Sequence, residues 1–152
     1  MKVDPSTARI MIVDDQEMHT RLLRTILTMA GFSNVQTLND PREAAAVFQR
    51  FEPDIVLLDL MMFPLDGFAV MRQIQSLVGD DDEVPIVFLT ADVNPEHRHR
   101  ALEQGAKDFL SKPFDHDEVI LRIRNLLETR FLYQRLREMA AGVESIMVEG
   151  AL

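Results

Sequence analysis

Short apolar runs alternate with amphipathic stretches along the chain. Three of the runs are continuously apolar and rich in Val, Ile and Leu, which is typical of strands buried on both faces of a sheet. We expect strands at RIMIV (9–13), NVQTL (34–38), DIVLLDL (54–60), PIVFLT (85–90) and KDFL (107–110).

Helix-length segments separate these strands, and their ends carry recognisable signals. Gly31 ends the first segment and suits a left-handed cap. Asp40 and Asp115 are each followed three residues later by a glutamate, Glu43 and Glu118, which is the capping-box pattern. We expect helices ending at 31, opening at 40–41, spanning about 67–78, spanning 94–105 and opening at 115.

Five strands that alternate with five helices imply right-handed crossovers. The sequence therefore predicts an α/β fold, a doubly wound parallel sheet of five strands, (βα)5, covered on both faces. In such sheets the reactive site lies at the carboxyl ends of the strands.

The tail from about residue 129 to 152 prolongs the last helix beyond what one domain needs. A narrow apolar seam follows it, with residues spaced by three or four: Leu132, Leu136, Met139, Val143 and Ile146. Apolar residues upstream follow another phase, so the pattern changes near Arg130: Val119, Ile123 and Leu126. We divide the chain into a domain, 1–128, and a C-terminal helical extension, 129–152.

Three interpretations of this extension stay open. It is a coiled coil that joins two copies of the chain in a homodimer, or a linker helix to an output domain outside this chain, and both can hold together. Otherwise it folds back on the domain.

Composition narrows the functional classes. Sixteen Lys and Arg against 25 Asp and Glu give a formal charge of −9, which argues against direct nucleic acid binding. The absence of cysteine excludes disulfides, thiol catalysis and Cys-ligated metals. The first residues lack the apolar core of a secretion signal, and no apolar run approaches the length of a membrane span, about 18 residues. We therefore expect a cytoplasmic protein without membrane insertion.

Polar residues stand at four of the predicted strand ends. Asp14 and Asp15 follow the first strand, Asp59 ends the third, Thr90 ends the fourth, and Lys112 lies just past the fifth. Three clustered carboxylates suit a hard cation such as Mg²⁺. Lys112 and Thr90 add a positive charge and a hydroxyl, which could compensate a tetrahedral anion. This set fits phosphoryl transfer with Asp59 as the nucleophile, because Asp59 ends the most apolar strand.

Four sequence pieces resemble the receiver (CheY-like) domain of two-component response regulators: IMIVDDQ, IVLLDLMM…LDGF, IVFLTA and GAKDFLSKPF. The resemblance covers roughly residues 8–128, and it implies a flavodoxin-like fold. The spacings agree with the family's, since 44 residues separate Asp15 from Asp59, 31 separate Asp59 from Thr90, and 22 separate Thr90 from Lys112.

The resemblance implies a role for each matching residue. Asp59 would accept a phosphoryl group from a sensor histidine kinase or a phosphotransfer protein. Asp15, Asp59 and the backbone carbonyl of Met61 would bind Mg²⁺, with Asp14 assisting. The domain would catalyse only its own phosphorylation and dephosphorylation and would switch conformation to control an output or partner in phosphorelay signal transduction.

Residues of the last two strands would carry the response to phosphorylation. Thr90 would hydrogen-bond the phosphoryl group and Lys112 would pair with it. Phe109 matches the family's switch aromatic, whose ring turns inward as Thr90 moves. Pro113 matches a position where the family commonly has a cis bond after lysine.

One position departs from the family, which usually has proline four residues after the acceptor. Phe63 occupies that place and Pro64 follows it, so we expect a reshaped loop beside the site.

The alternative function is a Mg²⁺-dependent phosphohydrolase of the haloacid-dehalogenase type. The haloacid-dehalogenase family normally has a second catalytic aspartate two residues after the nucleophile. This chain has Met61 at that position, so the general acid of that family is missing.

The four histidines suggest no further site. His97 and His99 are two residues apart and would point to different faces of a helix, unlike a pair of metal ligands. His19 and His116 have no partner by spacing, so we expect surface or capping roles.

Overall fold

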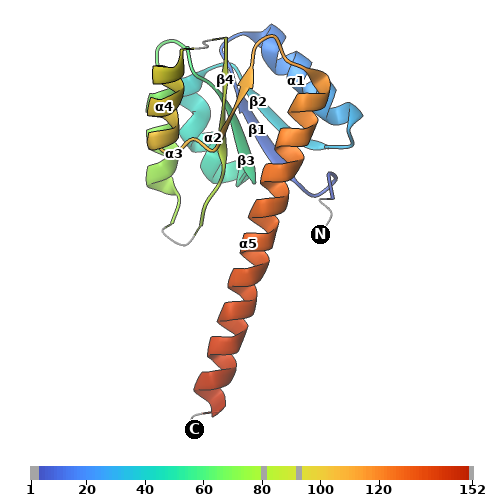
Figure 1. Ribbon diagram of the computed structural model, residues 1–152, viewed down its shortest axis with the longest axis vertical. Helices are drawn as coiled ribbons and strands as arrows, with labels where there is room; N and C mark the ends of the chain where they lie inside the picture. Colours follow the sequence, from blue (N-terminus) through green and yellow to red (C-terminus); the bar gives the residue numbers. More distant parts are fainter. Residues whose placement is uncertain (1–3, 80–81, 92–93, 151–152) are drawn as a thin grey trace.

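The computed structural model describes residues 4–79, 82–91 and 94–150. Five parallel strands form its sheet, in the order β2-β1-β3-β4-β5, and helices cover both faces (Figure 1). The elements in chain order are β1 (Arg9–Val13), α1 (Glu17–Met29), β2 (Asn34–Leu38), the 3₁₀ turn η1 (Pro41–Glu43), α2 (Ala44–Phe51), β3 (Ile55–Asp59), α3 (Gly67–Leu77), β4 (Ile86–Thr90), α4 (Pro95–Glu103), β5 (Asp108–Ser111) and α5 (His116–Gly150).

This topology confirms the predicted fold and locates the crevice. The chain adds β2 on one side of β1 and β3 on the other, so the order reverses between β1 and β3. Loops diverge from such a switch point, and ligands bind at the carboxyl ends of the strands beside it. Asp14 follows β1 and Asp59 ends β3, so the two residues flank the crevice.

Alternation along the central strands divides the core into two layers. Val56 and Leu58 of β3 pack on the side of α2 and α3, whereas Ile55 and Leu57 pack on the side of α1 and α5. Every residue of β3 and β4 is buried. These strands therefore read as continuous apolar runs, with Asp59 and Thr90 as their polar last residues.

Most helix ends match the sequence signals. Gly31 has φ +95°, and the Asp115 carboxylate accepts from the backbone N–H of Glu118 at 2.9 Å. The expected capping box at Asp40 is wrong in its details. The Asp40 carboxylate accepts from the backbone N–H of Arg42 and from its guanidinium, and the first turn is 3₁₀, so α2 begins only at Ala44.

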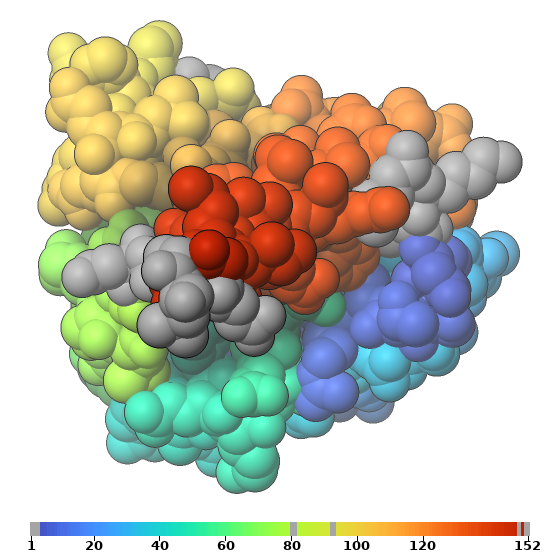
Figure 2. Space-filling model, turned by 90° about the horizontal axis from the view of Figure 1, so that it is seen from below, coloured from blue at the N-terminus to red at the C-terminus, as the bar shows by residue number. Residues whose placement is uncertain are grey.

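Helix α5 runs without a break from the sheet into the tail, which projects from the body (Figure 1) and points toward the viewer in Figure 2. Val119, Ile123 and Leu127 are buried against the sheet, and Arg130 is the last residue of the helix that is buried among those whose side chains the structure describes. The seam residues are 42–69% exposed. The fold-back interpretation is therefore wrong for residues 129–150; residues 151–152 lie outside the described part.

The change of phase near Arg130 has a geometric meaning. With about 3.6 residues per turn, Leu136 and Val143 lie on the side of α5 opposite Ile123 and Arg130. One face of the helix thus packs on the domain, and the opposite face carries the exposed seam. In the part of the chain that the structure describes, none of the helices combines the length and apolar character needed to cross a membrane.

Candidate functional site

The predicted site residues come together at the carboxyl edge of the sheet. Asp14, Asp59 and Thr90 are 0%, 3% and 3% exposed, whereas Asp15 is exposed. Carboxylate oxygens of Asp14, Asp15 and Asp59 all lie within 4.8 Å of one another. Three acidic groups from two strand ends therefore form one cluster that solvent reaches through Asp15.

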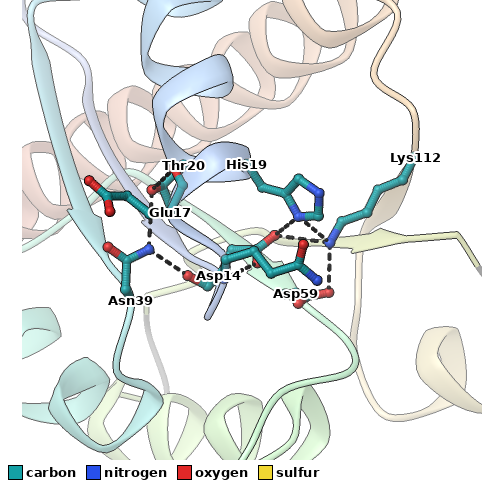
Figure 3. A network of polar contacts seen from close by, with 8 residues as sticks. Asp14, Glu17, His19, Thr20, Asn39, Asp59 and Lys112 are labelled. Atoms are coloured by element: carbon teal, nitrogen blue, oxygen red, sulfur yellow. Dashed lines mark hydrogen bonds and ion pairs between the residues drawn. The ribbon is translucent and has the colours of Figure 1, made fainter.

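Lys112 closes the cluster from β5. Its Nζ donates to Asp14 Oδ2 at 3.0 Å and to Asp59 Oδ1 at 3.2 Å, and its side chain is 14% exposed (Figure 3). The backbone N–H of Lys112 donates to the carbonyl of Thr90 at 2.9 Å, which ties the loop after β5 to the end of β4. The Lys112–Pro113 bond is cis, as the resemblance to the receiver family implied.

Asp14 is fixed by its own surroundings. Its backbone N–H donates to the carbonyl of Leu38, and the Asn39 amide donates to the Asp14 carbonyl at 2.8 Å and to the Thr20 hydroxyl at 3.2 Å (Figure 3). The backbone N–H of Gln16 donates to Asp14 Oδ1 at 2.9 Å. Both Asp14 oxygens therefore accept hydrogen bonds from the chain itself, because Lys112 occupies Oδ2.

Burial and the neighbouring Asp14 charge raise the pKa of Asp59 to about 6. Lys112 and the backbone N–H of Met61 oppose this rise by stabilising the carboxylate. Close carboxylates of this kind favour a bound divalent cation, since its charge offsets their repulsion. The donor set is all oxygen, which fits Mg²⁺.

His19 is a site residue that the sequence analysis missed. Its Nδ1 lies 3.1 Å from Asp14 Oδ2 and 2.9 Å from Lys112 Nζ, so the expectation of a surface or cap role is wrong (Figure 3). Its position along the chain could have indicated this role. His19 lies in the first turn of α1, where side chains lean back toward the end of the preceding strand. Of the other histidines, His99 pairs with Glu103 and His116 is half exposed.

The elements around the site are closely packed. Phe109 is 8% exposed, its ring lies 6.3 Å from that of Phe88, and the Arg98 guanidinium covers it at 5.3 Å. A Cβ on Gly67 would lie 2.5 Å from the Asp59 carbonyl oxygen, so α3 can start this close to β3 only with glycine.

The loop with the family departure leaves α3 intact. Phe63 is 83% exposed and the Phe63–Pro64 bond is cis. The Asp66 carboxylate accepts from the backbone N–H of Ala69 at 2.8 Å and caps the helix. The departure therefore places an aromatic side chain on the surface without disturbing the start of α3.

Comparison with known proteins agrees with this architecture. The chain is 39% identical over 149 residues to response regulator PleD of Caulobacter vibrioides, covering 95% of this chain and 32% of that protein. It is 32% identical over 150 residues to transcriptional regulatory protein TrcR of Mycobacterium tuberculosis, covering 99% of this chain and 57% of TrcR. This chain thus spans about a third of the length of PleD and 57% of the length of TrcR.

Solved structures give the same result. The receiver domain of NtrX from Brucella abortus superposes with a TM-score of 0.71 at 32% identity, covering 79% of this chain and 98% of that one. A longer NtrX structure in complex with ATP gives a TM-score of 0.78 at 30% identity, covering 87% of this chain and 29% of that one. The family model described as the response regulator receiver domain matches residues 10–124. The chain belongs to the receiver domain family of two-component response regulators.

Proposed function

We propose that Asp59 accepts a phosphoryl group from the phosphohistidine of a sensor histidine kinase or phosphotransfer protein, in a Mg²⁺-dependent reaction. The supporting observation is the arrangement of a buried carboxylate within hydrogen-bond distance of the Lys112 ammonium and beside two further carboxylates. Transfer of a phosphoryl group depends mainly on position and charge compensation, which this site supplies.

An oxygen of Asp59 would attack phosphorus in line with the leaving imidazole. The new P–O bond forms as the P–N bond breaks, and the bonding pair returns to the donor's nitrogen. Lys112 and the Thr90 hydroxyl would compensate the peripheral oxygens of the transferred group. Asp15, Asp59 and the Met61 carbonyl would hold Mg²⁺, which supplies further positive charge, and Asp14 would assist.

The phosphoryl group would shift an equilibrium between two conformations of the domain. Thr90 and Phe109 would connect the site to the face formed by α4, β5 and α5. The ring of Phe109 is already buried in this structure, so the coupled change would involve its cover, Arg98, as well as its own position. In this proposal the domain acts only on its own phosphoryl group and works in the cytoplasm.

A small phosphodonor such as phosphoramidate tests the assignment. We expect Mg²⁺-dependent labelling of the wild type with one phosphoryl group per chain, and its loss in Asp59→Asn. Asp117→Asn, at a side chain that is 92% exposed, is the matched control and should label normally. Undiminished labelling of Asp59→Asn would reject the assignment. Many turnovers of a phosphomonoester would instead favour the phosphohydrolase.

We also propose that residues 129–152 form a separate functional unit, a helical extension that pairs with a second copy and leads to an output domain in the whole protein. Three observations support it: the seam is exposed, it faces away from the domain, and the relatives are longer than this chain. Because opposite faces of α5 serve the two contacts, two domains could flank one coil.

Two valines provide a matched test of this pairing. Val143 lies in the seam and is 54% exposed, whereas Val148 is 68% exposed on the opposite side of the helix. Val143→Glu should shift the sedimentation of the chain toward the monomer, and Val148→Glu should not. A wild type that is monomeric with and without beryllofluoride would contradict the pairing.

A further inference from the structure

Asp14 and Asp15 lie in the short segment between β1 and α1, and only Asp14 is bonded to the rest of the domain. Asp14 is buried, and both its backbone and its side chain make hydrogen bonds. Asp15 is exposed and makes no hydrogen bond or ion pair within the part of the chain that the structure describes. Its position therefore depends on the peptide group that joins it to Asp14.

The side-chain amide of Asn39 binds this peptide group. It donates one hydrogen to the Asp14 carbonyl at 2.8 Å and the other to the Thr20 hydroxyl at 3.2 Å (Figure 3). The Thr20 hydroxyl in turn donates to the carbonyl of Glu17, which anchors the amide on the first turn of α1. An amide NH₂ group has two hydrogens, and Asn39 uses both.

Asn39 is itself held in place by β2. It follows Leu38, the last residue of that strand, which pairs with Val13. The backbone N–H of Asp14 donates to the Leu38 carbonyl at 3.1 Å. Leu38 and Asn39 thus bind the peptide groups before and after the same residue, Asp14, so the end of β2 fixes both of them.

Burial makes the bond from Asn39 hard to replace. Asp14 is 0% exposed, so its carbonyl oxygen has no access to bulk water in the folded domain. Without a donor at position 39, this oxygen would stay unsatisfied, which is costly, or turn toward solvent. Turning it rotates the whole peptide group, because the carbon–nitrogen bond is rigid. The rotation would move the backbone of Asp15 and, with it, the Asp15 carboxylate.

We propose that Asn39 is a positioning residue for the metal site. By fixing the peptide group between Asp14 and Asp15, it keeps the Asp15 carboxylate close to that of Asp59, within the 4.8 Å that the cluster spans. A carboxylate that is already in place loses less freedom when Mg²⁺ binds, so Asn39 raises the affinity for Mg²⁺. This inference rests on the proposed Mg²⁺-dependent phosphorylation of Asp59.

An NMR titration with MgCl₂ measures this affinity in the whole chain. Asn39 is exposed, so Asn39→Ala should fold, and it should bind Mg²⁺ about tenfold more weakly than the wild type. Asn34→Ala is the matched control and should bind Mg²⁺ like the wild type. Asn34 begins β2, and its side-chain amide donates to the Ser6 carbonyl at 2.9 Å, at the end of the strand remote from the site.

The dependence of labelling on Mg²⁺ separates positioning from general damage to the site. With phosphoramidate, half-maximal labelling of Asn39→Ala should need about tenfold more Mg²⁺, and the rate at saturating Mg²⁺ should equal that of the wild type. Thr20→Val keeps the shape of the side chain and removes the hydroxyl that anchors the amide. It should weaken Mg²⁺ binding by itself but cause no further loss in Asn39→Ala, because Thr20 acts through Asn39.

The outcomes keep the two proposals apart. The role of Asn39 would be rejected by wild-type Mg²⁺ affinity in Asn39→Ala, by an equal loss in Asn34→Ala, or by additive losses with Thr20→Val. A lower labelling rate of Asn39→Ala at saturating Mg²⁺ would reject it too. Labelling of Asp59 in the wild type would still stand in these cases. A wild type that neither binds Mg²⁺ nor labels would reject the proposed function itself.

Discussion

Replacing Asp59 with asparagine should stabilise the fold at neutral pH. Burial and the Asp14 charge raise the pKa of Asp59 from 3.8 to about 6, so the folded protein holds its proton more tightly than the unfolded chain does. Between these two values the folded state binds more protons, and the free energy of unfolding falls as the pH rises. Asparagine keeps the shape and removes the charge.

The size of the effect follows from the shift. Each pKa unit is worth about 1.4 kcal/mol, so a rise of roughly two units lowers the free energy of unfolding of the wild type by about 3 kcal/mol at pH 7.5. Asp59→Asn should be more stable than the wild type by this amount. At about pH 5, Asp59 of the folded wild type is already mostly protonated. The stability difference between Asp59→Asn and the wild type should therefore shrink to about half.

Urea unfolding at 25 °C with divalent ions chelated measures this difference. Asp117→Asn is the control, because its exposed carboxylate should contribute less than about 1 kcal/mol at the start of α5. An Asp59→Asn variant no more stable than the wild type at pH 7.5 would refute the reasoning. An advantage that stayed constant down to pH 5 would refute the assigned cause.

Two further predictions concern the framework of the site and the tail. The Arg130 side chain is 7% exposed, and its guanidinium donates to Asp54 and Asp82. Arg130→Met should therefore lower the free energy of unfolding in urea by about 2 kcal/mol and speed amide exchange where α5 leaves the sheet. Unchanged amide exchange would show that these ion pairs do not hold α5 to the domain. Gly67→Ala should lower the free energy of unfolding by about 2 kcal/mol, because its Cβ would meet the Asp59 carbonyl. Gly142→Ala, in an open helical position, should raise the free energy of unfolding by about 0.5 kcal/mol. Equal effects of the two substitutions would contradict the close contact at Gly67.

The sequence was sufficient for the fold because local signals and burial agree. Continuous apolar runs give β3 and β4 within one residue of their bounds, and positive-φ glycines end two helices. The strand-end position of Asp14, Asp59, Thr90 and Lys112 follows from the parallel order alone, since carboxyl ends meet at one edge.

Other features depend on contacts between distant residues. His19 has no partner by spacing, because Lys112 is 93 residues away and reaches it only through the fold. At Asp40, the side chain of Arg42 competes for the carboxylate that a capping box would use. The apolar seam of the tail could be seen in the sequence. Its direction relative to the domain could not, because it depends on which face of α5 is buried, and only the structure shows that this face carries Ile123 and Arg130.

Fluorine NMR of beryllofluoride bound to the protein tests the central assignment most directly. We expect a bound signal of one equivalent that requires both Mg²⁺ and the Asp59 carboxylate, and that disappears in Asp59→Asn. A bound signal that persists in this variant, or that forms equally well without a divalent ion, would show that Asp59 is not the phosphoryl acceptor in a Mg²⁺-dependent site.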